Sequence, residues 1–386
     1  MTNHELERAQ AELKAIHADW ALLSTTENVT YVSHFAVPVD FGALATLTYL
    51  PPLALVGVRD AASALLVGDV YEGAAKAQHA LEQVLAYQTG LAYERISPRD
   101  NFLNRLREAF KSAGLGSGTP KLAVEDKLPT VVMRRLQTEF PNVALIDAGA
   151  ALANARLIKT AREHDLLREA ALVNQAGHDE LRRQTREAGR NEYAMWAAVI
   201  QAMEQRAGQT LYVFGELVTG ARVRQVAYPG GPKDVITQPG DLALMDMSPR
   251  VNGYWSDTTN TMVIGSVEPN EKQKRYGVAA REAFYAAVET MRPGRQAREA
   301  FEAAKQTFAK YGLEIGHYAG HQIGVSVNED PRLLPFEDMP IQAGMVFSIE
   351  CGAYEGVQGD TGARIEKSVI VHADAPEILC DFEWGF

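Results

Sequence analysis

Two aspartates eleven residues apart are the first residues whose type and spacing suggest chemistry. In LALMDMSPRVNGYWSDTTNTMVIG, residues 242–265, Asp246 and Asp257 lie in strand-like runs on either side of PRVNGY. If residues 250–253 form a four-residue connection, the two carboxylates face one another across a hairpin. Carboxylates so placed repel, and a cation between them would remove the repulsion. A solvated acidic pair on an exposed hairpin is the alternative that this stretch leaves open.

Two glutamates lie in strands that otherwise consist of core residues. In GMVFSIECGAY, Glu350 ends a strand just before a Cys-Gly turn. In TGARIEKSVIVH, the alternation places Arg364, Glu366 and Ser368 on one face of a strand. A buried carboxylate without a partner costs several kcal/mol or becomes protonated. Each glutamate alone also fits a surface salt bridge, but together with the two aspartates they indicate a metal site.

Two histidines supply the nitrogen ligand. His317 and His321 lie in GHYAGHQIGVSVNEDP, residues 316–331, where the glycines at 316, 320 and 324 oppose a helix. We therefore expect a loop that enters a strand over QIGVSV, with one histidine binding metal and the other contacting substrate. A structural histidine is the alternative. Several carboxylates with one imidazole favour manganese or cobalt over a thiolate-type zinc site.

The elements that must position these residues form two domains. A chain of 386 residues is too long for one ordinary core, and we predict domains over residues 1–155 and 156–386. The first reads as α/β with a largely parallel sheet. Its expected strands are WALLS, LALVGVR, SALLVGD, KLAVE and VALIDAG, and its expected helices are AAKAQHALEQVLAY, RDNFLNRLREAFKSAGLG and PTVVMRRLQTEF.

The second domain reads as an antiparallel sheet flanked by helices, an α+β plan. Two amphipathic helices are expected over residues 160–189 and 192–208. Extended segments separated by glycines follow, interrupted by helices over residues 270–291 and 297–312. The candidate ligands all lie in this extended part.

Composition limits the possible partners and location. The net charge of −11 disfavours nucleic acid and anionic membranes as partners, since binding either depends on clustered Lys and Arg. The sequence has no apolar signal region and no run long enough to span a membrane. Its two cysteines, Cys351 and Cys380, are too few for a disulfide framework. We expect a soluble cytoplasmic protein.

The motifs resemble those of the pita-bread metallopeptidases, the family of aminopeptidase P, prolidase, methionine aminopeptidase and creatinase-like proteins. The matching residues are the paired aspartates with GYWSDTTNT, the histidine of GHQIG, and the glutamates of SIECG and RIEK. The resemblance implies a C-terminal pita-bread fold preceded by an α/β creatinase-type N-terminal domain. The N-terminal part of this chain, including TTENVTYVSHF, resembles that domain. It covers nearly the whole chain.

The resemblance also implies two divalent metal ions, with manganese expected first and cobalt, zinc or iron as alternatives. Asp246 would bind one ion, and Asp257 and Glu366 would bridge both. His321 and Glu350 would complete the second ion's ligands, with Glu350 also acting as the general base for the bridging water. Such a pair of ions lowers the pKa of that water and polarises the scissile carbonyl.

The substrate side departs from the family pattern. His317 and Arg364 match residues near the family's substrate, but Asn328 stands where a histidine usually contacts the substrate carbonyl. Pro229, beside Tyr228, stands where another histidine is usual. The sequences ECG, TNT and RIEK replace the usual EPG, TRT and RIED. An asparagine can donate a hydrogen bond but cannot become cationic, and Tyr228 could supply another donor.

Three functions are compatible with this pattern. The first is a dinuclear hydrolase of the Xaa-Pro type that cleaves the bond before proline in short peptides. The second is a hydrolase of a small metabolite's amide or C–N bond on the same scaffold, as in creatinase and ectoine hydrolase. The third is a binding protein without activity. The resemblance to dimeric relatives implies a homodimer, in which FAVPVDFGALATLTYLPP reaches the neighbouring subunit or is a buried loop of its own domain.

Overall fold

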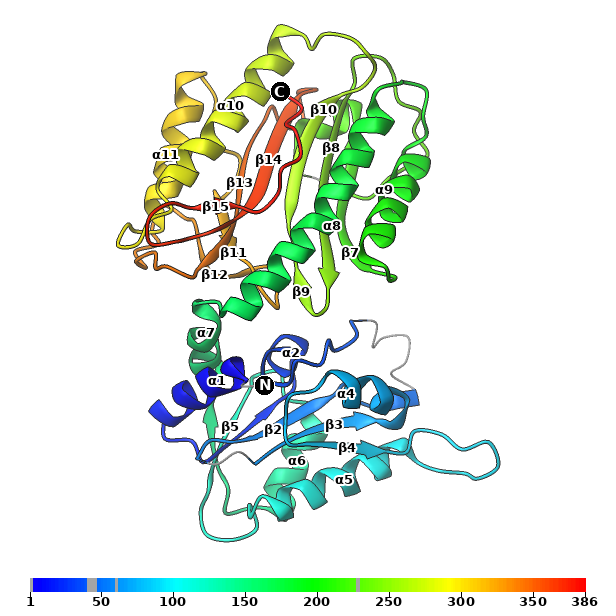
Figure 1. Cartoon of the computed structure of the whole chain (residues 1–386), viewed down its shortest axis with the longest axis vertical. Helices are drawn as coiled ribbons and strands as arrows, with labels where there is room; N and C mark the ends of the chain where they lie inside the picture. Colours follow the sequence, from blue (N-terminus) through cyan, green and yellow to red (C-terminus); the bar gives the residue numbers. More distant parts are fainter. Residues whose placement is uncertain (1–2, 40–46, 60–61, 227–229) are drawn as a thin grey trace. The chain divides into compact units, whose positions relative to one another are not determined.

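The computed structural model describes residues 3–39, 47–59, 62–226 and 230–386. The chain divides into two compact units, Met1–Leu157 and Ile158–Phe386, which are described separately (Figure 1). Helix α7 (Gly149–Leu157) ends the first unit, and α8 (Ala161–Thr185) begins shortly after the division. Part of the FAVPVDFGALATLTYLPP segment, residues 40–46, lies outside the described residues.

The first unit contains a mixed sheet. Within the described residues six strands pair in the order β4-β3-β2-β1-β5-β6. The prediction of a largely parallel sheet is correct for β3–β4, β1–β5 and β5–β6. It is wrong for β1–β2 and β2–β3, which are antiparallel. For β2–β3 the reason is the short connection between them, since parallel neighbours need a long crossover. The strands are β1 (Trp20–Leu23), β2 (Leu53–Gly57), β3 (Ser63–Gly68), β4 (Gln83–Tyr87), β5 (Lys121–Val124) and β6 (Ala144–Asp147).

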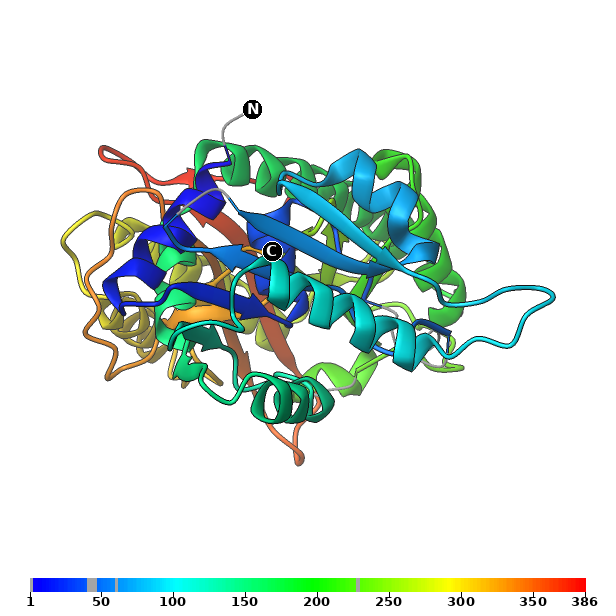
Figure 2. The same ribbon diagram turned by 90° about the horizontal axis from the view of Figure 1, so that it is seen from below.

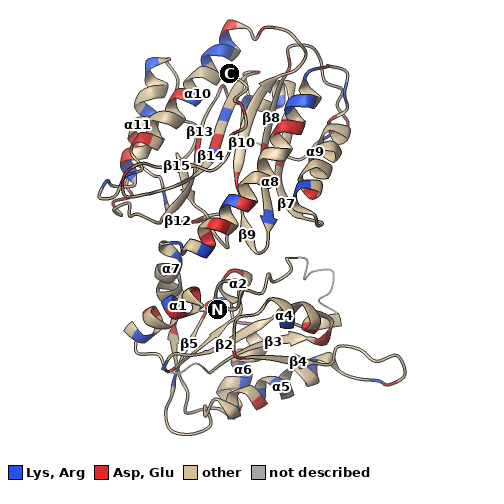
Figure 3. Ribbon diagram, viewed as in Figure 1, with Lys and Arg blue, Asp and Glu red and all other residues tan. Residues whose placement is uncertain are grey.

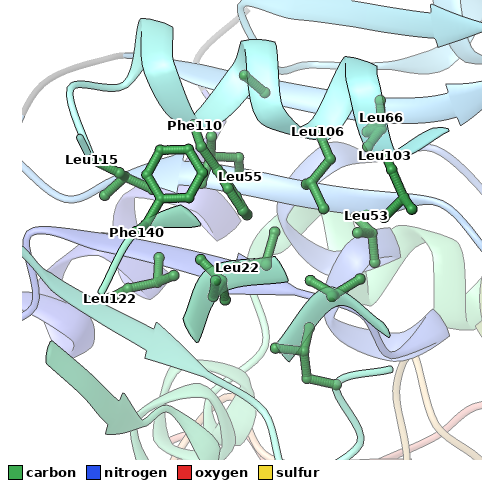
Figure 4. Packing of buried hydrophobic residues seen from close by; sticks show 14 of the residues in the cluster. Leu22, Leu53, Leu55, Leu66, Leu103, Leu106, Phe110, Leu115, Leu122 and Phe140 are labelled. Carbon is green, nitrogen blue, oxygen red and sulfur yellow. The ribbon is translucent and has the colours of Figure 1, made fainter. Parts of the chain in front are cut away.

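Helices cover both faces of this sheet. Figures 1 and 2 show α5 and α6 on one face and α1, α2 and α4 on the other. Between the sheet and α5, leucines of the strands pack against Leu106 and Phe110 (Figure 4). This apolar layer stabilises the unit. The helices are α1 (His4–Ala15), α2 (Thr26–Ser33), α4 (Glu72–Gln78), α5 (Pro98–Ser112) and α6 (Thr130–Glu139).

One predicted helix in the first unit is partly wrong. The stretch AAKAQHALEQVLAY was expected to be helical throughout, but α4 ends at Gln78 and Gln83–Tyr87 form strand β4. Residues 83–87 pair with the parallel strand β3. Pairing with a distant strand thus outweighs the local helix pattern.

The second unit contains an antiparallel sheet, as predicted. Within the described residues its main path is β12-β11-β13-β14-β10-β8-β7, with β9 paired to β8 and β15 to β14. This order brings strands from residues 242–263 and 320–370 side by side. The strands are β7 (Tyr212–Thr219), β8 (Leu242–Val251), β9 (Tyr254–Trp255), β10 (Thr258–Val263), β11 (Gly320–Gln322), β12 (Glu329–Arg332), β13 (Val346–Tyr354), β14 (Gly362–Ile370) and β15 (Glu377–Ile378).

Two helix pairs accompany this sheet: α8 with α9 (Glu192–Ala207), and α10 (Glu271–Glu289) with α11 (Arg298–Lys310). Figure 1 shows α8 beside β8 and α10 beside β13 and β14. Thr160 begins α8 with a capping box that includes Glu163, so two backbone amides without an acceptor inside the helix are satisfied by side chains. Acidic and basic residues alternate along α8, α10 and α11 (Figure 3). None of the described helices is long and apolar enough to cross a bilayer.

Candidate active site

Four of the five predicted metal ligands lie on neighbouring strands of the second unit, and the fifth, Asp257, directly precedes β10. Glu350 of β13 pairs with Glu366 of β14, Glu366 pairs with Thr259 of β10, and Thr259 pairs with Asp246 of β8. Residues directly opposite in an antiparallel sheet share a face. These side chains therefore form a row across one face of the sheet, called here the inner face.

Asp257, His321 and Glu366 are the tightest group in this row's neighbourhood. Each offers a ligand atom within 4.8 Å of the others, and all three side chains are buried. His321 Nε2 lies 3.5 Å from Asp257 Oδ2. These three residues come from positions 64 and 45 residues apart along the chain, so the sheet, rather than a local motif, brings them together.

The predicted register of the hairpin before this group is wrong. Asp246 faces Thr259, and not Asp257, because the connection is the two-residue turn Asn252–Gly253. Both turn residues have positive φ, 49° and 90°, as a type I′ turn requires. The shift is two residues, so both aspartates stay on the inner face. Ser248 Oγ donates to Asp257 Oδ1 at 2.8 Å.

The orientation of His321 suits metal binding. Its Nδ1 lies 3.0 Å from the Gln322 carbonyl, which can only accept, so Nδ1 carries the proton. The lone pair of Nε2 is then directed toward Asp257. Burial alone would lower the pKa of His321, but the Asp257 carboxylate raises it above its ordinary value. His321 lies on strand β11, which ends at Gln322, so the predictions of a loop at this histidine and of a strand over QIGVSV are wrong.

Glu366 carries an unsatisfied buried oxygen. Thr259 Oγ donates to Oε2 at 2.7 Å, whereas Oε1 has no hydrogen-bond partner among the described residues. Burial, followed by the charges of Asp257 and Glu350, raises the pKa of Glu366 well above its usual value. Burial also raises the pKa of Asp246, despite the neighbouring Arg364 guanidinium. Oxygen atoms so crowded and poorly solvated fit the ligand set of a divalent cation.

Arg364 balances part of this negative charge. The guanidinium donates to Asp246 Oδ2 at 2.7 Å and to the Tyr354 hydroxyl at 2.8 Å. It also forms an ion pair with Glu216 of β7. Sequence reasoning missed Glu216 and Tyr354. The signal for Glu216 was an acid within the strand-like stretch YVFGELVT, the same pattern that singled out Glu350.

Glu350 lies in the middle of β13, which continues through Cys351 and Gly352 to Tyr354. The predicted Cys-Gly turn is therefore wrong, because β14 pairs with β13 along this whole stretch. Gly352 has a specific role: a Cβ there would lie 2.7 Å from His317 Nε2. The glycine thus leaves room for the histidine ring.

His317 lies beside Glu350 and is held by the protein on both nitrogens. Nδ1 bonds to the Tyr318 carbonyl at 2.7 Å, and Nε2 lies 3.2 Å from the Tyr354 hydroxyl. Nδ1 is also 4.0 Å from Glu350 Oε2. Burial lowers the pKa of His317, so the neutral ring is favoured.

Asn328 precedes β12 and contacts two side chains. Its Oδ1 accepts from Arg332 Nε at 3.1 Å, and its Nδ2 lies 3.4 Å from the Tyr318 hydroxyl. Because arginine can only donate, this contact fixes which end of the amide faces Tyr318. The Tyr318 ring in turn packs edge-on against His321. The predicted substrate residue Tyr228 and the neighbouring Pro229 lie outside the described residues.

Comparisons with known proteins agree with both units. The family described as Metallopeptidase family M24 matches residues 165–373, and the Creatinase/Prolidase N-terminal domain matches residues 5–158. A Xaa-Pro dipeptidase of Lactobacillus helveticus is 31% identical over 269 residues, 67% of this chain and 70% of the relative. A Xaa-Pro dipeptidase of Pyrococcus horikoshii is 28% identical over 309 residues, 78% of this chain and 85% of the relative.

A solved structure has the same fold over nearly the whole chain. The prolidase from Pyrococcus horikoshii matches with a TM-score of 0.79 and 22% identity, covering 98% of this chain and 99% of the prolidase. The predicted fold class, a pita-bread domain preceded by a creatinase-type α/β domain, is confirmed.

Proposed function

This chain belongs to metallopeptidase family M24, and we propose that it is a metal-dependent Xaa-Pro dipeptidase that hydrolyses the amide bond before proline in short peptides. The names of its relatives support this substrate class. The observation that carries the proposal is the buried group Asp257, His321 and Glu366, in which Glu366 Oε1 lacks a partner among the described residues. Buried carboxylates without a counter-charge are costly, so this group is more stable with a cation bound than in the metal-free protein.

Two divalent ions fit the charges of the site. Arg364 pairs with three carboxylates, Glu216, Asp246 and Glu350. With Asp257 and Glu366 nearby, the site holds five carboxylates, which exceed this guanidinium by four negative charges when all five are ionised. Two divalent cations would balance that excess. In the assignment we propose, Asp246 would hold one ion, Asp257 and Glu366 would be shared by both, and His321 with Glu350 would complete the second. Oxygen ligands with one imidazole favour manganese, with cobalt, zinc and iron as alternatives.

When bound, the ions would lower the pKa of a shared water and polarise the scissile carbonyl. The chain's own residues then place and accept protons. Glu350 is the general base, with its Oε2 held 3.8 Å from Arg364 Nε and 4.0 Å from His317 Nδ1. Arg364 keeps the Asp246 carboxylate in place through a 2.7 Å hydrogen bond.

Two predicted substrate residues, His317 and Arg364, lie beside this base, and a third, Asn328, lies next to Tyr318. His317, neutral and packed over Gly352, has its Nδ1 4.0 Å from Glu350 Oε2. Asn328 offers the N–H groups of an amide fixed by Arg332. We propose that Asn328 donates to the substrate carbonyl, while His317 and Arg364 line the pocket. Tyr228 stays a proposed substrate contact.

The decisive experiment is proline release from Ala-Pro, Leu-Pro and a longer Xaa-Pro peptide with Mn²⁺ present. We expect release from the dipeptides and its loss on metal removal with EDTA. Leu-Ala serves as the matched peptide without proline. If no Xaa-Pro peptide is cleaved by metal-loaded protein, the peptidase proposal is wrong.

A hydrolase of a small metabolite's amide or C–N bond is the second candidate. It is favoured by Asn328, which cannot supply the positive charge of a histidine beside the substrate carbonyl. Hydrolysis of a non-peptide amide such as N-acetylproline in the absence of Xaa-Pro cleavage would favour this candidate. A protein that binds no divalent ion and hydrolyses neither class would instead fit the third candidate, a binding protein.

We also propose a homodimer that works in the cytoplasm. The free, buried cysteines Cys351 and Cys380 fit a reducing compartment. Light scattering that gives only a 42.2 kDa species would contradict the dimer.

A further inference from the structure

The face of the sheet opposite the ligands is covered by the segment Cys380–Phe386, called here the strap. In Figure 1 it is the red coil that ends at the label C and runs along the sheet between α8 and α10. Phe382 is buried, and its ring packs edge-on against Trp384 with centroids 5.3 Å apart. Trp384 Nε1 donates to the Tyr285 hydroxyl of α10 at 3.0 Å.

Lys367 of β14 is enclosed by this strap. Its Nζ lies 4.3 Å from the centre of the Phe382 ring and 4.1 Å from the centre of the Trp384 ring. It also donates to the Phe382 carbonyl at 2.7 Å. An ammonium desolvated between two aromatic faces is held more strongly than one at the surface. Lys367 is the residue that changes the usual RIED of the family to RIEK.

Asn260 of β10 binds the strap with both ends of its amide. Its Nδ2 donates to the Glu383 carbonyl at 2.9 Å, and its Oδ1 accepts from the Gly385 amide at 3.1 Å. The strap backbone lies so close to β10 that a Cβ on Gly385 would be 1.9 Å from the Thr261 carbonyl oxygen. Asn260 is the middle residue of the TNT that replaces TRT, so two departures from the family pattern bind one segment.

A third contact reaches β10 through α8. The His178 ring stacks on Phe382 with centroids 4.0 Å apart. Its Nε2 lies 2.8 Å from the Thr258 hydroxyl. The strap therefore holds Thr258 indirectly, through a histidine that is itself buried.

Lys367 and Asn260, which contact the strap directly, and Thr258, which the strap reaches through His178, alternate with residues of the site. Successive side chains on a strand point to opposite faces, so each outward residue follows an inward one. The inward neighbours are the two proposed bridging ligands and the threonine that donates to one of them. The pairs are Asp257 with Thr258, Thr259 with Asn260, and Glu366 with Lys367.

We propose that Lys367 and Asn260 are positioning residues that act through the strap to fix the separation of Asp257 and Glu366. This role rests on the proposed function, since it assigns those two residues to the metal ions. Binding sites need their ligands held within about 0.5 Å, and side chains that support ligands typically contribute 10- to 100-fold in metal affinity. The strap contacts the outward side chains of β10 and β14 and so fixes the positions of these two strands relative to each other.

The test measures binding of Mn²⁺ alone to metal-free, full-length protein by calorimetry. Lys367→Met keeps the volume but removes the ammonium, and we expect about tenfold weaker Mn²⁺ binding. Lys367→Arg keeps a cation over the rings and is expected to recover most of the affinity. Asn260→Ala removes only two hydrogen bonds, so it reports on the strap even if Lys367→Met does not fold. Low-temperature electron paramagnetic resonance then shows whether the signal of a coupled Mn²⁺ pair changes.

Phe308→Leu provides the matched control. Phe308 is buried on α11, which packs on α10, so this change lowers the melting temperature without touching β10 or β14. If the Lys367 and Asn260 variants bind Mn²⁺ as tightly as Phe308→Leu and give an unchanged pair signal, the strap is only structural and the inference is wrong. If the unaltered protein binds no Mn²⁺, the proposed function fails together with this role.

Discussion

Two buried glutamates, one in each unit, have opposite surroundings. Glu125 of the first unit accepts hydrogen bonds on both oxygens from Ser24, Thr25 and Asn28, at the start of α2. Glu366 of the second unit has one donor, Thr259, and an oxygen without a partner among the described residues. Burial is similar, 6% exposed against 1%, so the difference lies in the hydrogen-bond donors and in the neighbouring charges.

The difference separates a carboxylate that stabilises the fold from one that binds a ligand. At Glu125 the helix start and three polar side chains replace water, so the charge is stabilised by the fold itself. At Glu366 the neighbours are other carboxylates, and burial together with their charges raises its pKa, so the fold by itself does not stabilise the ionised form. The surroundings of Glu366 are stable when a bound ligand supplies the missing partner. Without the ligand, they lower the free energy of unfolding.

Glu366→Gln should give the largest effect. It tests whether Glu366, unlike Glu125, is a carboxylate that binds a ligand. We expect Xaa-Pro hydrolysis to fall by about a thousandfold or more, because the change removes a ligand that we propose is shared by both ions. We also expect the metal-free variant to melt at a higher temperature than the unaltered protein, since the repulsion from Asp257 and Glu350 is reduced. Proline release and thermal melting in EDTA measure the two effects. A metal-free variant that melts lower would place Glu366 with Glu125 as a structural residue.

Glu125→Gln should give the next largest effect, with the opposite sign for stability. The amide cannot accept all the donors around Ser24 and Asn28, and we expect a loss of about 2–3 kcal/mol in the free energy of unfolding. Mn²⁺ affinity at the second unit should stay the same. Urea denaturation and calorimetry check both statements. A change in Mn²⁺ affinity without a loss of stability would contradict the structural role.

The contrast also shows what the sequence could predict. Glu366 and Glu350 are predicted because acids interrupt apolar strands, and burial is what makes such acids unusual. Asp257 is predicted from its spacing to Asp246 across the hairpin. The family resemblance gave the same residues and the fold class. Glu216 shows the same pattern in YVFGELVT, so it could have been found by applying the argument to every strand.

Other features depended on contacts that local patterns do not contain. Whether Asn252–Gly253 alone or residues 250–253 made the hairpin turn decided the register, and both fit the turn residues. Gln83–Tyr87 became a strand through pairing with β3, and β13 ran past Cys351 because β14 paired along it. The strap could not be predicted from the sequence, because only the folded chain brings Lys367 and Asn260 against residues 382 and 383.

Asn328 sharpens the comparison, because its amide is only partly satisfied. Oδ1 has Arg332 at 3.1 Å, but among the described residues Nδ2 has only the distant Tyr318 hydroxyl at 3.4 Å. This spare N–H is the donor that we propose for the substrate carbonyl. Asn328→His restores a group that can carry charge, and we expect about tenfold higher kcat for Ala-Pro. Asn328→Ala should lower kcat, and equal rates for all three proteins would exclude Asn328 from the substrate contacts.

Glu377 should give the smallest effect, because it is well satisfied but partly exposed. The hydrogen bond from Arg168, with a further contribution from His372, lowers the pKa of Glu377 from 4.5 to about 2. A lowered pKa stabilises the folded protein above the unfolded value of 4.5, and this stabilisation is lost as the pH falls toward 2. The side chain is 35% exposed, so solvent screening reduces the contribution to about 1 kcal/mol.

Glu377→Gln should therefore be about 1 kcal/mol less stable than the unaltered protein in urea at pH 7, and this difference in the free energy of unfolding should narrow below pH 4.5. Glu187→Gln, at an exposed ion pair with Arg190, should show no comparable gap; a gap independent of pH for Glu377→Gln would mean that packing, rather than charge, holds this residue.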